Sequence, residues 1–396
     1  MPLLARLLQT TWFIGCDIWL GLTLILHCAG TIWSYFTCGP RRPTWDLKVA
    51  LIHTFIHHSF TSSLKVGIHY ARRNQRDLAV SPRVGINYPI NPWTLEESEV
   101  RAIPGLVKAL EPISQLLRPT TTNSFKKASS APTNVAFEDH ILPAEWVVHR
   151  EVQGRMAARM TTHKHQSNAN SLGHLGPLFP AEPIMLYLHG GGFVMGGFGG
   201  HRPLICELSK QIGRHIFTID YRLAPEHRFP CALVDVIYTY LKLVATPTQG
   251  GLGFNADRII LAGDSAGGTL IVTTMLFLRD HNLPLPQGVI LLSPWLDLTC
   301  TTPSWTQHIP FDFLGPVFIT DPLFNPALSY ASPDASYVGH LPYITHPYVS
   351  PLTPMPTTTT TTPTDPPTSF HNLPPILIQG DEPNKWQTIS YGSPIA

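Results

Sequence analysis

The sequence predicts an α/β protein with a mostly parallel β-sheet and helices on both faces of that sheet. From residue 183 onward, short apolar runs typical of buried strands alternate with segments of helical periodicity. In the most informative stretch, an apolar run at 258–263 passes through a glycine-bounded turn into an apolar helical run at 269–278. This alternation of strand and helix favours a parallel sheet.

Each element is expected from its own pattern of apolar, glycine and proline residues. The expected strands are 184–188, 215–220, 258–263, 288–293 and 373–380, and the expected helices are 203–212, 233–244 and 269–278.

Length and composition limit the classes of function. The chain has 396 residues, which allows one large domain with attachments. Its formal net charge is +1 with 13% charged residues, so no basic surface suggests a nucleic acid partner. The six cysteines contain no C-x-x-C pair, which argues against a zinc site and against a disulfide scaffold. These cysteines are Cys16, Cys28, Cys38, Cys206, Cys231 and Cys300.

The first feature along the chain is an apolar segment at 12–36, interrupted only by Asp17 and His27. At about 1.5 Å per residue, its uncharged part 18–36 is long enough for one membrane crossing. We expect a single-pass membrane anchor at 1–43, in a protein of the endoplasmic reticulum. A signal peptide or a buried core helix would give a similar pattern. Arg41, Arg42 and Lys48 follow the segment and only Arg6 precedes it, a bias too small to fix the sidedness.

Residues 44–180 are expected to form a cap or linker with a polar insertion at 156–175. Helical periodicity predicts a helix at 47–64, which carries His53, His57 and His58, and another at 96–117. For this histidine cluster, packed or interfacial histidines are a better explanation than a metal site.

The sequence Gly263-Asp264-Ser265-Ala266-Gly267 matches the G-x-S-x-G pattern of a nucleophile elbow, with Ser265 at its apex. Small residues beside the serine prevent collisions where strand and helix nearly touch. The helix that follows directs its N-terminal amides toward the site, which favours developing negative charge there. Ser265 is therefore a candidate nucleophile.

A second motif, His189-Gly190-Gly191-Gly192, follows the strand expected at 184–188. In this position it presents bare backbone amides, which are the donors that an oxyanion requires. A phosphate-binding loop is the competing interpretation, but the lysine and hydroxyl residues of that motif are absent. The charged loop at 221–230 is expected to brace the site, and His227 within it precedes the serine and is not expected to be the base.

Together with Asp220-Tyr-Arg-Leu-Ala-Pro-Glu and Ser293-Pro-Trp-Leu-Asp-Leu, these motifs resemble the hormone-sensitive lipase family of α/β-hydrolases, over about 183–380. With its apolar N-terminal segment, the chain is also similar to the fungal steryl acetyl hydrolase-like esterases, which are membrane-attached. The resemblance implies an α/β-hydrolase domain at 181–396 acting on a small-molecule carboxylic ester, with lipid or steryl acetates as examples. It implies Ser265 as nucleophile, the amides of Gly191, Gly192 and Ala266 as oxyanion hole, and no cofactor or metal.

The resemblance also implies a catalytic acid just after the last strand, where Asp381 and Glu382 are the candidates. The family's catalytic histidine lies beyond the acid, but no histidine follows His371 in this sequence. Residues after 380 show neither strand nor helix patterning, so we expect the C-terminal end of the fold to be missing. Three interpretations stay open: an ester hydrolase, a catalytically dead ligand-binding module, and a non-functional truncated product.

Five aromatic residues lie in a proline-rich segment expected to cover the substrate pocket. Lining of an apolar cavity and simple core packing account equally well for them. They are Phe311, Phe313, Phe318, Phe324 and Tyr330. The oligomeric state is left open.

Overall fold

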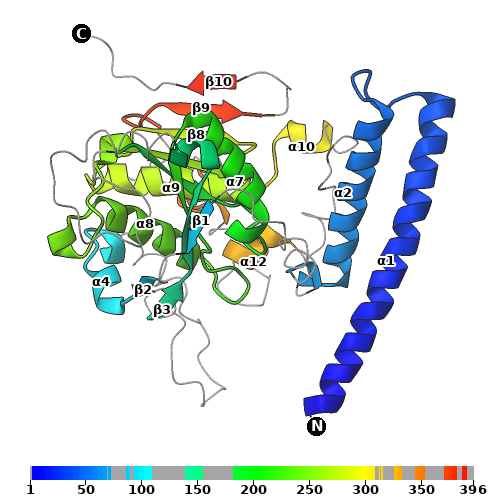
Figure 1. Ribbon diagram of the computed structural model, residues 1–396, viewed down its shortest axis with the longest axis horizontal. Coiled ribbons are helices and arrows are strands. Elements are labelled where there is room, and N and C mark those ends of the chain that lie inside the picture. The colour runs from blue at the N-terminus through cyan, green and yellow to red at the C-terminus, as the bar shows by residue number, and fades with distance from the viewer. Residues whose placement is uncertain are drawn as a thin grey trace, which may run out of the picture. The chain divides into compact units, whose positions relative to one another are not determined.

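The computed structural model describes residues 2–68, 70–72, 86–89, 93–108, 139–154, 182–307, 312, 314, 325–331, 344–352, 370–380 and 386–389 (Figure 1). The chain divides into two compact units. One comprises Met1–Leu78 with Cys300–Pro326, and the other comprises Ala79–Thr299 with Ala327–Ala396. The domain boundaries expected at residues 43 and 180 stay a prediction.

The larger unit is built on an eight-stranded sheet in the order β1-β4-β6-β5-β7-β8-β9-β10. The five central strands, β6-β5-β7-β8-β9, pair parallel with one another. At the two edges, β1 pairs antiparallel with β4, β4 with β6, and β10 with β9. The bounds are β1 Ile86–Pro89, β4 Ala144–Val148, β5 Ile184–Leu188, β6 His215–Ile219, β7 Ile259–Asp264, β8 Gly288–Leu292, β9 Ile376–Gln379 and β10 Trp386–Ile389.

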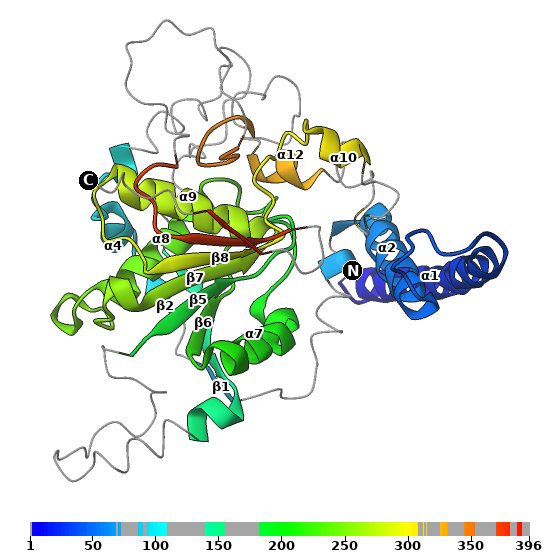
Figure 2. The ribbon, with the colours of Figure 1, turned by 90° about the horizontal axis from the view of Figure 1, so that it is seen from above.

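Helices cover both faces of this sheet (Figure 2). On one face, α7 (Phe198–Ile212) packs Ile205 and Cys206 against Met185 of β5 and Ile216 of β6. On the other face lie α8 (Cys231–Val244) and α9 (Ala266–Asp280), both almost entirely buried on the sheet side. The expectation of a mostly parallel sheet with helices on both faces is confirmed.

Helix α7 begins five residues earlier than the pattern at 203–212 predicted. Its first amide, Phe198 N, donates to Asp220 Oδ1 at 2.7 Å, so the carboxylate caps the helix start. Burial raises the pKa of Asp220 to about 6, against the opposing effect of this hydrogen bond. The cap comes from the end of β6, and local periodicity cannot reveal it.

The C-terminal segment contains a strand that the sequence pattern does not predict, β10. Residues after 380 were expected to lack strand patterning, but β10 pairs antiparallel with β9, with Trp386 opposite Gln379 and Ile389 opposite Ile376. Four residues are too few for a clear alternation, although Trp, Thr and Ile all favour strands. The edge of β9 is therefore paired rather than open.

The helix expected at 96–117 is also wrong in its length. Helix α4 (Glu97–Arg101) ends at a turn in which Gly105 has a φ of 75° in the left-handed region, and helical residues resume at 106–108. Pro104 disfavours a helical conformation in the residue before it, and Gly105 then breaks the helix. Residues 109–117, like the insertion expected at 156–175, lie outside the described residues. Nearby, β2 (Trp93–Leu95) pairs with β3 (His140–Leu142) in a separate two-stranded sheet.

The smaller unit contains α1 (Pro2–Cys38), α2 (Leu47–Val66) and the short α10 (Pro303–Gln307). The helix expected at 47–64 is confirmed as α2. Within the described chain, one helix is long and apolar enough to cross a bilayer, at Gly15–Cys38 in α1.

Candidate active site

Ser265 lies at the junction of β7 and α9 with φ 48° and ψ −119°. A positive φ is costly for a residue with a side chain and is found where surrounding contacts enforce it. Here the amide of Ser265 donates to Leu292 O of β8 at 3.1 Å, and its carbonyl accepts from Trp295 N at 3.1 Å. The serine is thus held in a sharp strand-to-helix turn by the neighbouring strand and its following loop.

Glycines surround Ser265 because the backbone of β5 comes very close. A Cβ on Gly267 would lie 2.2 Å from Leu188 O, and one on Gly263 would lie 2.7 Å from the same oxygen. This oxygen belongs to the backbone at the end of the central strand β5, so it cannot move aside. The expectation that small residues are needed at this turn is confirmed.

The His189–Gly192 segment turns back directly after β5, beside the elbow. Gly190 N donates to Asp264 Oδ1 at 2.9 Å. Gly191 and Gly192 have φ values of 118° and 60°, and the Gly191 carbonyl accepts from Val194 N and Met195 N. The loop therefore closes on itself and is attached to the elbow through the Gly190–Asp264 hydrogen bond.

Three amides at this place make no hydrogen bond to any described residue: those of Gly191, Gly192 and Ala266. Gly192 and Ala266 are buried. Buried backbone amides are nearly always paired, so the two buried amides without a partner, together with that of the half-buried Gly191, are donors available to a ligand. Ala266 is also the first residue of the fifteen-residue α9, where the helix dipole favours negative charge.

Asp264 joins the two motifs. Its Oδ1 accepts from Gly190 N and, at 2.7 Å, from the hydroxyl of Tyr187, and it lies 3.5 Å from His201 Nε2. Burial alone would raise the pKa of Asp264, but the hydrogen bond and charge of His201 and the Tyr187 hydroxyl lower it below its usual range. Burial likewise opposes protonation of His201, yet Asp264 raises the pKa of His201 above its usual value. Each group therefore favours the charged form of the other.

Tyr187 and His201 were missed by the sequence analysis. A tyrosine inside an apolar strand run is an ordinary core residue, and a histidine in the first turns of a helix has many explanations. Only their convergence on Asp264 distinguishes them, and that depends on the pairing of β5 with β7.

His189 packs its buried side chain against the glycine loop and the start of the 221–230 loop. Its side chain is fully buried and its ring stacks on Tyr221, with centroids 4.3 Å apart and planes at 10°. Nδ1 lies 2.7 Å from Gly190 O, and the Tyr221 hydroxyl donates to His189 O at 2.7 Å. Burial, with a smaller effect of the nearby His201, lowers the pKa of His189 to about 4, so the ring is neutral at pH 7.

The charged loop at 221–230 is fixed by a buried ion pair. Arg222 Nη2 donates to Asp235 Oδ1 at 2.7 Å, and His140 Nε2 lies 3.0 Å from the same oxygen. Burial opposes ionisation of Asp235, but the Arg222 charge lowers its pKa below the usual range. The ion pair fixes the loop itself, whereas the expectation that the loop braces the site stays a prediction, as does the role of His227.

Of the five aromatic residues expected near a cavity, the structure describes Tyr330. It lies in α12 (Pro326–Ala331), is 1% exposed, and stacks on Phe193 with centroids 3.9 Å apart. Tyr330 is therefore a core residue behind the glycine loop. The other four lie outside the described residues, as do Asp381 and Glu382.

Strand β9 ends at the same edge of the sheet as the elbow. Gln379 O accepts from Ser293 N at 2.7 Å, directly beyond the end of β8. The predicted residues Ser265, Gly191, Gly192, Ala266, His189, Gly190, Asp264 and Gly267 thus meet at the ends of β5 and β7. In the described chain, no group of three or more His, Cys, Asp or Glu residues is placed to hold a metal ion.

Comparison with known proteins gives consistent matches. A family model described as alpha/beta hydrolase fold matches residues 185–384. An acetyl-hydrolase of Streptomyces hygroscopicus is 38% identical over 124 residues, which are 31% of this chain and 40% of that protein. An esterase of Acinetobacter venetianus is 35% identical over 124 residues, covering 31% and 39%. Hormone-sensitive lipase of Mus musculus is 38% identical over 114 residues, covering 29% and 15%. The chain thus spans less than half the length of each of these relatives.

Proposed function

This chain belongs to the α/β-hydrolase fold family, in the branch of the hormone-sensitive lipases and related esterases, and on that premise we propose that it hydrolyses carboxylic esters with Ser265 as nucleophile. One observation carries the proposal. A strained serine at a strand-to-helix turn lies beside free buried amides on two separate segments. A structural turn needs neither the strained serine nor the unpaired donors.

The reaction follows from this geometry in two acyl-transfer steps. The Ser265 hydroxyl attacks the ester carbonyl, and the amides of Gly191, Gly192 and Ala266 stabilise the oxyanion that forms. The alcohol leaves, an acyl-serine remains, and water then releases the carboxylic acid. The start of α9 adds a favourable field at the position where the charge develops.

Activation of Ser265 needs a base that a carboxylate orients. We propose Asp381 or Glu382 as this carboxylate, because both follow directly after β9 in the sequence. Of the histidines beside the elbow, His189 is fully buried and His201 is held by Asp264, so we assign neither as the base.

We propose a small-molecule ester of an apolar alcohol as substrate, with acetates of lipids or sterols as the first to test. The names of the relatives support this choice, since one is an acetyl-hydrolase and another a lipase. We also propose that α1 attaches the protein to a membrane, in the endoplasmic reticulum, where apolar esters dissolve.

The experiment compares hydrolysis of p-nitrophenyl acetate by the full chain in detergent, by Ser265→Ala, and by Thr248→Ala as an exposed control. We expect loss of at least about a thousandfold in rate for Ser265→Ala and no change for the control. Equal background rates for all three proteins would refute hydrolysis by this polypeptide. A rise in unfolding temperature on adding a non-hydrolysable apolar ester would then favour the ligand-binding alternative over a non-functional product.

A further inference from the structure

Helices α1 and α2 lie side by side and run in opposite directions, joined by the short segment 39–46 (Figure 1). Thr23 Oγ1 lies 3.0 Å from His58 Nε2, and Thr31 Oγ1 lies 2.8 Å from Thr54 Oγ1. Since residue numbers rise along α1 as they fall along α2, these two pairs fix the helices as an antiparallel hairpin.

Several polar side chains between the two helices have hydrogen-bond partners within the hairpin. Besides these two contacts, Thr31 donates to His27 O at 3.0 Å and Thr54 donates to Ala50 O at 2.9 Å. The His27 ring lies 4.4 Å from the His58 ring, centroid to centroid. Thr54 and His58 are buried, at 9% and 7% exposure. Internal pairing of polar groups is what a lipid environment demands.

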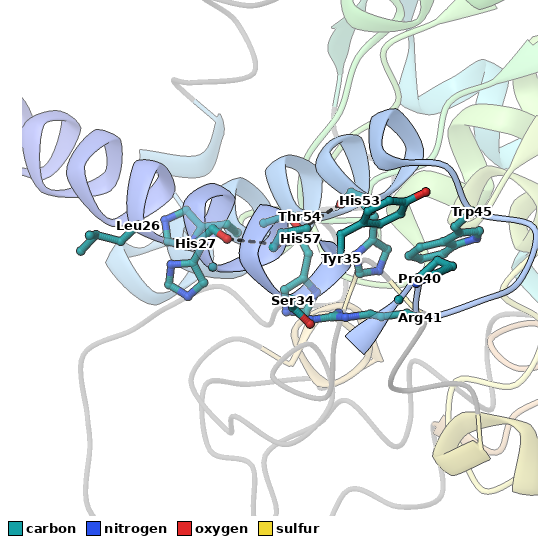
Figure 3. A pocket seen from close by; sticks show the side chains of 15 residues that line it. Leu26, His27, Ser34, Tyr35, Pro40, Arg41, Trp45, His53, Thr54 and His57 are labelled. Carbon is teal, nitrogen blue, oxygen red and sulfur yellow. Dashed lines mark hydrogen bonds between the residues drawn. The ribbon is translucent and has the colours of Figure 1, made fainter. Parts of the chain in front are cut away.

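A pocket of about 390 Å³ lies between the two helices (Figure 3). His27, Thr54 and His57 line one part of it, while Arg41 and Trp45 line the part at the helix connection. Polar groups of membrane helices face such an interior and not the acyl chains. Arginine and tryptophan are typical of the membrane–water interface.

The outward face of α2 has the opposite character. Between Lys48 and Lys65, which are exposed near its two ends, the exposed described side chains of α2 are apolar: Val49 40%, Ile52 48%, Phe55 49% and Ile56 39% exposed. A water-soluble amphipathic helix buries such residues and exposes its polar ones. Helix α1 also exposes large apolar side chains, with Leu22, Ile25 and Trp33 more than half exposed. The hairpin is therefore inverted relative to a soluble pair of helices.

Helix α2 is less apolar than the candidate span in α1, but its length and its charge pattern fit a membrane span when it is paired with α1. Between Lys48 and Lys65, residues 49–64 contain no Asp, Glu, Lys or Arg. At about 1.5 Å per residue these sixteen residues cover about 24 Å. The two lysines can extend their charges to the surfaces of a hydrocarbon layer of about 30 Å. Just beyond the end of α2, the Tyr70 hydroxyl donates to Asp17 of α1. The carboxylate of Asp17 therefore lies at the same end of the hairpin as Lys65.

We propose that α2 crosses the membrane together with α1, as a two-crossing hairpin whose outward face contacts the acyl chains of the bilayer. This inference rests on the membrane attachment in the proposed function and goes beyond the single crossing expected there. With two crossings, the residue 1 end and the residues that follow α2 lie on the same side of the membrane. With one crossing they lie on opposite sides.

The test is glycosylation mapping in microsomes after alkaline extraction. The natural sequence contains no N-x-Ser or N-x-Thr site, so any glycosylation comes from an added site and shows that this site lies in the lumen. One tag is placed before residue 1, a second after Ala396, and a third in a flexible insert after Pro40. We expect the protein in the membrane pellet, the two end tags in agreement, and the insert in the opposite state.

Each other pattern contradicts the inference in a distinguishable way. If the insert and the C-terminal tag share one glycosylation state and the N-terminal tag has the other, α1 alone crosses the membrane. This result would keep the attachment by α1 and refute the second crossing. Release of the protein by alkali would refute the attachment itself, and the hairpin with it.

A pair of variants tests the outward face of α2 directly. Phe55→Lys places a charge at mid-helix, whereas Val49→Lys places it beside Lys48, where it can reach the surface. We expect Phe55→Lys to shift at least half of the molecules to the single-crossing pattern and Val49→Lys to shift none. An unchanged two-crossing pattern for Phe55→Lys would show that residue 55 does not face the acyl chains, and would refute the outward face assigned to α2.

Discussion

Replacing Asp264 by asparagine tests whether this carboxylate holds the elbow and the glycine loop together. Its Oδ1 accepts hydrogen bonds from Tyr187 and Gly190 at 2.7 and 2.9 Å, and His201 Nε2 lies 3.5 Å away. The asparagine keeps the size of the side chain and one acceptor oxygen, but it loses the charge. Since a hydrogen bond to a charged group contributes about 1.5–3 kcal/mol, we expect the free energy of unfolding to fall by about that amount.

The same substitution is expected to lower the rate of hydrolysis. Gly190 immediately precedes the two glycines proposed as oxyanion donors, so weakening its bond displaces them from the carbonyl. Removal of one such donor costs about a hundredfold or more in kcat. We therefore expect a large fall in kcat on p-nitrophenyl acetate with little change in KM.

The assay combines urea unfolding at pH 6 with steady-state kinetics on the full chain in detergent. Asp257→Asn, an exposed change of the same chemistry on the 3₁₀ turn Ala256–Arg258, is the control and is expected to match the wild type. If Asp264→Asn unfolds at the wild-type urea concentration and keeps its kcat, Asp264 does not clamp the two motifs and the proposed role is wrong.

Three further predictions concern the same region. Gly267→Ala places a Cβ 2.2 Å from Leu188 O, so we expect a loss of about 1–3 kcal/mol or more in unfolding free energy, measured against Gly154→Ala, whose Cβ meets open space. The pKa of His201 is raised in the folded protein, so its charge stabilises fully below about pH 6.5 and progressively less as the pH rises through the folded pKa. His201→Gln should therefore lower the unfolding temperature at pH 6 more than at pH 9, and an equal loss at both would contradict the ion pair. Arg222→Met leaves Asp235 buried without its main partner and should cost about 3–5 kcal/mol in urea unfolding, whereas Arg222→Lys should cost less.

The parts of the fold that local chemistry dictates were predictable from the sequence. An apolar run, a glycine and a small-residue turn specify β7, the elbow and α9, because each step depends on neighbours in the chain. The same holds for β5 and the glycine loop that follows it. At the site, this is enough to identify Ser265 and the amides of Gly191 and Gly192 as candidates.

What could not be predicted depends on partners far away in sequence. Strand β4 pairs with β6, more than 70 residues later, and its sequence Ala-Glu-Trp-Val-Val is too short to identify alone. Its Glu145 is 2% exposed yet accepts from Arg202 of α7 at 2.8 Å, a contact that no local pattern contains. The convergence of Tyr187 and His201 on Asp264 is of the same kind.

The backbone of Ser265 is fixed entirely by the protein. Its amide and carbonyl are bonded to β8, to the loop after it and to α9, through Leu292, Trp295 and Thr269. These bonds come from the protein alone, so the position of the proposed nucleophile does not depend on a bound substrate. Side chains that contact the acyl or alcohol part of an ester can therefore be exchanged without moving the serine, and a change of substrate preference in this chain need not cost catalytic geometry.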